Sequence, residues 1–177
     1  TQTKTVHLPY DAMIHEARTP DTKNGAQTGF YPGGEDIFQK HFTAPQAWQG
    51  KPVSLVFEGV YQTALVYLNG WLLTRNVNGY AEFTVEAGPY LKYGADNLLK
   101  VIADNSLEPN SRWYTGSGIY RPVRLLVGNK VYLPQDTVRI TTREADEDFA
   151  LLDVTAQVQS ASTVTERVTL QQTICRE

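Results

Sequence analysis

The sequence has few of the features that mark disulfide-linked, membrane-spanning or nucleic-acid-binding proteins. Its one cysteine, Cys175, cannot form a disulfide within the chain, which excludes a disulfide scaffold and leaves the compartment open. No apolar run reaches the roughly 18 residues that a membrane-spanning helix needs. The formal net charge of −3 gives no basic field, so nucleic acid is not an expected partner.

Length and composition indicate a folded protein. The chain has 177 residues, of which 41% are hydrophobic and 20% charged, so it can bury a core. It starts at Thr1 without a methionine or an apolar leader segment, and we interpret it as a piece of a longer protein. Cytoplasmic and periplasmic or secreted locations both remain open.

Hydrophobic residues alternate with a period of two, which predicts strands and not helices. One strand face is expected to carry Val53, Leu55 and Phe57. The dipeptide Asn69-Gly70 predicts a two-residue hairpin turn, because both positions of a type I′ turn need positive φ. Many short strands separated by Gly-containing turns indicate an all-β protein, either a β-sandwich or a jelly roll. The clearest alternating runs are 52–59, 63–70 and 97–104.

The pattern changes near residue 129, which predicts two domains, 1–129 and 130–177. The second contains the run 151–159, where apolar and polar side chains alternate as in one sheet of an Ig-like sandwich. We expect a further strand after the turn at 160–162. An Ig-like domain takes about 100 residues, and only about 50 follow the boundary. The second domain is therefore expected to be the first part of such a sandwich.

The stretch NSRWYTGSGIYRPVRLLVG, residues 110–128, places aromatic and guanidinium side chains around small residues. The rings of Trp113, Tyr114 and Tyr120 could stack on a sugar, or they could close one end of the sandwich. Both alternatives stay open for these rings. For Arg121, beside Pro122 at the expected start of a strand, a structural role is favoured.

Other candidate chemistry is weak. The acidic run Glu144–Asp148 lies between two expected strands and is interpreted as a solvated loop, not as a pair of catalytic carboxylates. His7, His15 and His41 are widely spaced and show no metal-ligand spacing, so no metal site is assigned. Nucleophile-elbow and phosphate-loop motifs are absent from the sequence.

Three stretches together resemble glycoside hydrolase family 2, which includes β-galactosidases, β-glucuronidases and β-mannosidases. The stretch SRWYTGSGIYRPVRLLV resembles the end of that family's N-terminal sugar-binding domain. VHLPYDAMIHEARTPDTKNGAQTGFYPGGEDIFQKHF resembles its opening, with Tyr10 where histidine is usual, and VSLVFEGVYQTALVYLNGWLL resembles its central hairpin. The run from Arg112 to Arg121 looks most like bacterial β-galactosidases.

The resemblance implies a jelly-roll, galactose-binding-like β-sandwich at 1–129, followed by the start of an Ig-like domain at 130–177. It also implies a retaining double displacement by two glutamates of a (β/α)₈ barrel. No glutamate here matches those catalytic motifs, so the chain alone is expected to be inactive. Loops of the family's first domain reach the barrel mouth. By position, the substrate-binding residues would be Asn24, Ser111, Arg112 and Trp113.

The expected partners are a β-galactoside or related carbohydrate and the catalytic barrel of the parent protein. No cofactor is expected in this chain, whereas a metal ion in the parent and a homo-oligomeric state are left open. Three alternatives remain: an autonomous carbohydrate-binding module, a purely structural module, and a domain of a β-glucuronidase or β-mannosidase.

Overall fold

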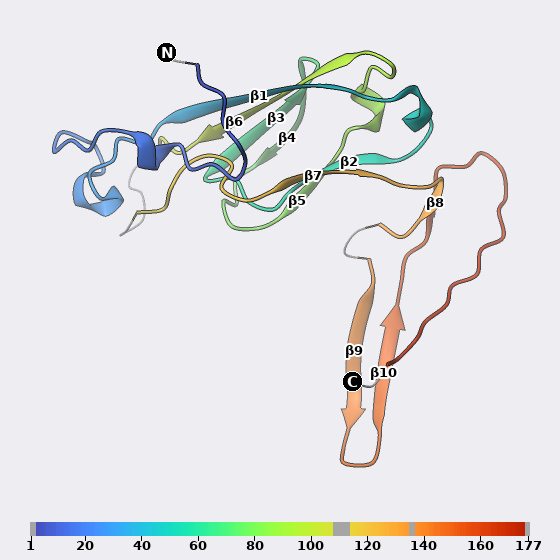
Figure 1. The fold of residues 1–177 in the computed structure, drawn as a ribbon. Helices are drawn as coiled ribbons and strands as arrows, with labels where there is room; N and C mark the ends of the chain where they lie inside the picture. The colour runs from blue at the N-terminus through green and yellow to red at the C-terminus, as the bar shows by residue number, and fades with distance from the viewer. Residues whose placement is uncertain (1–2, 108–113, 135–136, 176–177) are drawn as a thin grey trace. The chain divides into compact units, whose positions relative to one another are not determined.

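The computed structural model describes residues 3–107, 114–134 and 137–175. The chain divides into two compact units, Thr1–Val127 and Gly128–Glu177. Figure 1 shows strands in both units and no long helix in the described residues. The all-β expectation is therefore confirmed.

The first unit contains two antiparallel sheets. In the four-stranded sheet the order is β1-β6-β3-β4, and in the three-stranded sheet it is β5-β2-β7. Each strand of the first sheet is paired in register along most of its length, for example Phe38 with Val101 and Val66 with Val101. The strands are β1 (Glu35–Thr43), β2 (Val53–Phe57), β3 (Thr63–Leu68), β4 (Trp71–Asn76), β5 (Phe83–Glu86), β6 (Asp96–Asp104) and β7 (Val123–Val127).

The core lies between these two sheets and is built from the alternating positions of the sequence. Every second residue of β2, β3 and β6 faces inward, and these side chains form one buried cluster. Phe57 is fully buried and its ring stacks on that of Phe83 with centroids 4.9 Å apart. The predicted face of Val53, Leu55 and Phe57 is therefore confirmed as a core face.

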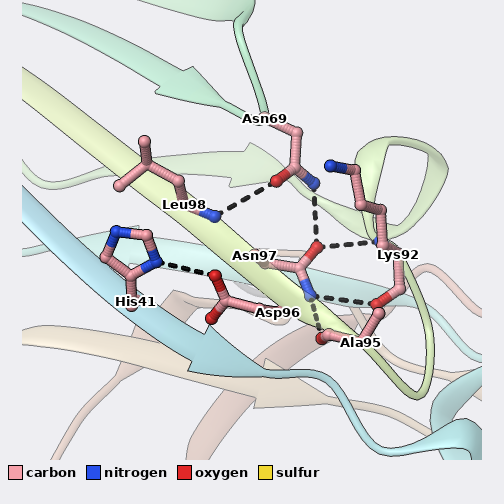
Figure 2. A network of polar contacts seen from close by, with 7 residues as sticks. All are labelled: His41, Asn69, Lys92, Ala95, Asp96, Asn97 and Leu98. Atoms are coloured by element: carbon pink, nitrogen blue, oxygen red, sulfur yellow. Dashed lines mark hydrogen bonds and ion pairs between the residues drawn. The ribbon is translucent and has the colours of Figure 1, made fainter.

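The β3–β4 hairpin turns at Asn69-Gly70, as predicted. Asn69 has φ 52° and Gly70 has φ 91°, so both residues adopt the left-handed conformation that this turn requires. The Asn69 side chain accepts a hydrogen bond from the Leu98 backbone N–H at 3.1 Å and donates to the Asn97 side chain at 2.8 Å. Figure 2 shows these contacts, which attach the turn to β6.

Asn97 is the centre of this polar network (Figure 2) and is only 1% exposed. Its Nδ2 donates to the carbonyls of Lys92 at 3.0 Å and Ala95 at 2.9 Å. Its Oδ1 accepts from the Lys92 backbone N–H and from Asn69 Nδ2, both at 2.8 Å. The buried amide therefore has a partner for each donor and lone pair, which is the condition for burying it without a large penalty.

The second unit consists of two strand pairs. The strands β9 (Arg139–Ala145) and β10 (Ala150–Thr155) form a hairpin, and β8 (Val131–Tyr132) pairs with β11 (Gln159–Ser160). Among the described residues of this unit none is buried, because no second sheet faces the hairpin. The expected strand beyond 160–162 is wrong, since residues 161–175 have no strand. The acidic run ends β9 and forms the exposed hairpin turn.

Helical structure in the described residues is limited to short 3₁₀ turns. No helix among them has the length and apolar character to cross a bilayer. The turns are η1 (Met13–His15), η2 (Gly25–Thr28), η3 (Gln46–Trp48) and η4 (Gly88–Tyr90).

Candidate functional site

The long connections of the first unit gather at one end of the sandwich, which we call the loop end. In the four-stranded sheet, the first residue of β1 lies beside the last residue of β6, which in turn lies beside the first residue of β3. In the three-stranded sheet, the last residue of β2 lies beside the first residues of β5 and β7. Figure 1 shows the resulting loops at the end from which β1 starts. The described connecting segments are 10–34, 58–62, 77–82, 105–107 and 114–122.

Asp11 links two of these segments. Its Oδ2 accepts a hydrogen bond from the Tyr114 hydroxyl at 2.5 Å, and its Oδ1 accepts from the backbone N–H groups of Met13 and Ser117, each at 3.0 Å. Hydrogen bonds to a charged acceptor are stronger than neutral ones. The carboxylate therefore holds Tyr114, the first described residue after 108–113, in a fixed position.

The turn at 116–118 packs closely against this carboxylate. Gly116 has φ 73°, and a Cβ at this position would lie 2.9 Å from Asp11 Oδ2, so only glycine fits. The buried Asn105 donates to the Gly116 carbonyl at 3.1 Å, and the Ser117 hydroxyl donates to Asp36 at 2.9 Å. The small residues of this stretch therefore allow a close approach of backbone to side chains from β1 and from the end of β6.

The segment 17–34 forms a compact loop that contacts the same region. Its ends are joined by the Thr19 N–H donating to the Phe30 carbonyl at 3.0 Å, and the Phe30 N–H donates to the Gly25 carbonyl at 2.9 Å. The Tyr31 ring lies 5.2 Å from the Tyr114 ring, centroid to centroid. This contact brings the 17–34 loop, which contains Asn24, next to Tyr114.

Tyr120 and Arg121 have structural contacts at the loop end. The Tyr120 hydroxyl donates to the Gly79 carbonyl at 2.8 Å, and Arg121 reaches the Tyr80 carbonyl at 3.5 Å. Both bonds hold the segment 77–82, whose Tyr80 ring is 57% exposed and packs edge-on against Tyr61. These contacts agree with the structural role favoured for Arg121, which stays a prediction.

Two carboxyl groups near Asp11 carry raised pKa values. Burial raises the pKa of Glu16, and the negative charges of Asp36 and Asp11 add to the effect. Burial also raises the pKa of Asp36, against the hydrogen bond from Ser117. The pKa of the Tyr114 hydroxyl is raised by burial and by its bond to Asp11, so it stays protonated and donates. Within the described ranges, no three His, Cys, Asp or Glu side chains are arranged to hold a metal ion.

We expect Glu16→Gln to raise the melting temperature at pH 7. The pKa of Glu16 in the folded state lies above its ordinary value of 4.5. The contribution of Glu16 to the free energy of unfolding is therefore most favourable at low pH, where the group is protonated, and it is lost as the pH rises through the raised pKa. Glutamine removes the charge that the folded state disfavours. The gain should be largest at pH 7 and vanish below about pH 4. Thermal unfolding followed by circular dichroism at both pH values measures it.

The control for this experiment is Glu35→Gln, an exposed carboxyl at the start of β1. This substitution should leave the melting temperature nearly unchanged at both pH values. Burial is the main cause of the raised pKa of Glu16, and its buried Oε2 has no hydrogen-bond partner among the described residues that would offset the loss of hydration there. The quantity to compare is the melting temperature of Glu16→Gln minus that of the parent chain. If this difference is smaller at pH 7 than at pH 4, the explanation is contradicted.

The sequence matches the glycosyl hydrolase 2 galactose-binding domain-like family over residues 10–162. This match covers most of both structural units. The chain belongs to glycoside hydrolase family 2. The resemblance inferred from the three sequence stretches is thereby confirmed.

Curated relatives of this family 2 chain include enzymes of two specificities. It is 34% identical over 167 residues to a β-galactosidase of Bacteroides ovatus, covering 94% of this chain and 20% of that enzyme. It is 33% identical over 129 residues to a β-glucuronidase of Formosa agariphila, covering 63% of this chain and 13% of that enzyme. The chain therefore spans about a fifth or less of the length of these relatives.

Solved structures of the family share this fold. A β-glycosidase from Bacteroides vulgatus superposes with a TM-score of 0.81 at 35% identity, over 88% of this chain and 20% of that one. A family 2 member from Bacteroides cellulosilyticus gives a TM-score of 0.80 at 31% identity, over 88% of this chain and 21% of that one. The strand arrangement seen here is therefore that of the family.

The four predicted substrate-binding residues of the family 2 chain fall in two places. Asn24 lies at the start of η2 on the 17–34 loop, where it is half-buried and its carbonyl accepts from the Gln27 N–H at 3.0 Å. Ser111, Arg112 and Trp113 lie outside the described residues. The first described residue after them, Tyr114, contacts Asp11 and Tyr31.

The sequence interpretation missed the residues that organise this end. Asp11 and Tyr114 are 103 residues apart, and no local pattern relates them. Asp11 does belong to the quoted opening stretch, so the resemblance contained the residue without indicating its contacts. Phe30 has φ 66°, an uncommon conformation for a bulky residue, and its aromatic neighbours gave no signal of it.

Proposed function

We propose that this chain is the galactose-binding-like domain and the start of the Ig-like domain of a longer glycoside hydrolase. In this proposal the loop end contributes part of the substrate site of a (β/α)₈ barrel located elsewhere in the parent protein. The hydrolysis is a retaining double displacement by two glutamates of that barrel. The observation that carries the proposal is the convergence of the 17–34 loop and the Tyr114 segment, joined by the Tyr31–Tyr114 contact.

The proposed substrate is a β-galactoside. The relative at 34% identity, matched over 94% of this chain, is a β-galactosidase. The run from Arg112 to Arg121 also resembles that of bacterial β-galactosidases. A β-glucuronidase relative at 33% identity favours a second candidate, a β-glucuronide. We also propose that residues 130–177 belong to the Ig-like domain of the same parent. The division of the structure after Val127 supports this assignment.

The full-length protein tests this proposal. We expect it to hydrolyse p-nitrophenyl β-galactoside with a higher kcat/KM than p-nitrophenyl β-glucuronide, and the 177-residue chain alone to hydrolyse neither. Trp113→Ala in the full-length protein should lower kcat/KM about tenfold, since aromatic contacts to a ligand often contribute more than 1 kcal/mol. An unchanged kcat/KM would show that Trp113 does not contact the substrate.

A separate experiment distinguishes an autonomous carbohydrate-binding module. The 177-residue chain is titrated calorimetrically with galactose, lactose and a galacto-oligosaccharide. A dissociation constant in the micromolar to millimolar range for the isolated chain favours the module. The absence of binding, together with activity of the full-length protein, favours a domain that acts only beside its barrel.

A further inference from the structure

A shallow depression lies on the 17–34 loop. It has a volume of about 280 Å³ and is lined by Arg18, Thr19, Pro20 and Phe30. Pockets that enclose drug-sized ligands have about 300–1,000 Å³. The depression is open and smaller than this range, so it can accommodate a single ring at the surface but not a whole oligosaccharide.

Phe30 is an unusual residue in this depression. Its backbone has φ 66°, a left-handed conformation that is costly for a residue with a large side chain. The side chain is 36% exposed and does not belong to the buried core cluster, so core packing does not account for it. Conformations of this kind are concentrated at sites with a function.

Arg18 lies beside the Phe30 ring in a fixed orientation. Its Nε donates to the Gly29 carbonyl at 2.9 Å. Its guanidinium carbon lies 6.0 Å from the centroid of the Phe30 ring and 5.8 Å from that of Tyr31. The guanidinium is therefore positioned by one hydrogen bond and two aromatic rings, and it presents its planar donor group at the depression.

We propose that this depression is a subsite for one pyranose ring of the substrate, separate from the ring whose glycosidic bond is cleaved. A pyranose has an apolar C–H face, which suits the exposed ring of Phe30, and oxygen substituents, which suit the donors of Arg18. The inference rests on the proposed function, because the substrate must reach the loop end. The inference assigns Phe30 and Arg18, which are not among the predicted substrate-binding residues, a role in binding longer substrates.

The test uses the full-length enzyme with two substrates of the sugar that it cleaves, an aryl glycoside with one ring and an oligosaccharide of at least three rings. Phe30→Gly removes the ring and keeps a residue that adopts positive φ readily, so the loop is preserved. We expect KM for the oligosaccharide to rise about tenfold with kcat unchanged, because the contact is remote from the reacting bond. The kinetic constants for the aryl glycoside should stay within about twofold.

Two further variants complete the test. Phe30→Trp should restore KM for the oligosaccharide, because it restores the stacking surface. Trp71→Ala removes a 66% exposed ring at the opposite end of the sandwich and should leave kcat and KM unchanged for both substrates. Equal effects of Phe30→Gly on both substrates, or no effect on the oligosaccharide, would overturn the subsite.

This outcome is independent of the test of the proposed function. If Trp113→Ala leaves both substrates unchanged while Phe30→Gly raises KM for the oligosaccharide, the contact proposed for Trp113 fails and the subsite stands. If Trp113→Ala lowers kcat/KM for both substrates and Phe30→Gly has no effect, the proposed function stands and the subsite fails.

Discussion

Replacing Asn97 by Asp is expected to lower the free energy of unfolding of the first unit by about 3–5 kcal/mol. Asn97 Nδ2 donates to the carbonyls of Lys92 and Ala95 (Figure 2). In the variant a carboxylate oxygen would replace this donor, so that it would face two carbonyl oxygens without a proton to share. The side chain is 1% exposed, so water cannot compensate for the lost donors or the buried charge. Urea unfolding followed by circular dichroism at pH 7 measures the change.

The neighbouring residue provides the matched control. Asp96 pairs with His41 at 2.7 Å, but more than half of each side chain is exposed (Figure 2). Because exposed ion pairs contribute at most about 1 kcal/mol, Asp96→Asn should change the free energy of unfolding by less than that amount. An Asn97→Asp variant whose stability matches that of Asp96→Asn would contradict the role assigned to the buried amide.

Amide hydrogen exchange can identify the backbone positions that the Asn97 network stabilises. Its amide positions the backbone of Lys92, and through Asn69 it holds the β3–β4 hairpin turn. In Asn97→Ala, we expect faster amide hydrogen exchange at Lys92 and Leu98. The Lys92 N–H loses its acceptor, Asn97 Oδ1. The Leu98 N–H keeps its acceptor, Asn69 Oδ1, but Asn69 is no longer held in place by Asn97. Amides in β7 should exchange at the parent rate, because they bond to β2 in the other sheet.

The strands β2, β3 and β6 could be predicted because each follows from a local alternation of apolar and polar residues. The alternation of Val53, Leu55 and Phe57 specifies a strand with one buried face, and the structure buries all three. Asn69-Gly70 specifies the hairpin turn through the φ values it tolerates. In the second unit the same alternation was a poorer guide. Val154 and Val158 alternate with polar residues, but no facing sheet among the described residues covers them.

The candidate site could be predicted only in part. The resemblance indicated one segment that the structure describes at the loop end, the one that contains Asn24. The contacts that organise this end depend on residues distant in sequence, such as Asp11 with Tyr114, and on backbone conformations such as that of Phe30. Neither kind of information is present in a local pattern. The buried Asn97 was also missed, because an asparagine inside a strand reads as a solvent-facing residue until its partners are known.

Asp11→Ala is expected to have the largest effect at the loop end. It removes the acceptor of three hydrogen bonds, from Tyr114, Met13 and Ser117, and bonds to a charged group contribute about 1.5–3 kcal/mol each. Since Asp11 is only partly buried, water replaces some of this loss, and we expect about 3–4 kcal/mol in total. Chemical unfolding of the 177-residue chain measures it.

The same substitution should act on catalysis if the proposed function is right. Releasing Tyr114 frees the chain next to Trp113, and a displacement of about 1 Å in a substrate-positioning group can lower a rate about a hundredfold. We therefore expect Asp11→Ala to lower kcat/KM of the full-length enzyme by that order.

Graded variants separate the carboxylate's role from a general loss of stability. Asp11→Asn keeps one acceptor oxygen for Met13 and Ser117 and should lose less of both stability and kcat/KM than Asp11→Ala. Tyr114→Phe removes a single bond to the carboxylate and should lose less than Asp11→Ala as well. Asp21→Ala, which removes an exposed carboxyl on the 17–34 loop, should leave both quantities nearly unchanged. If Asp11→Ala and Asp21→Ala behave alike, the carboxylate does not hold the loop end together.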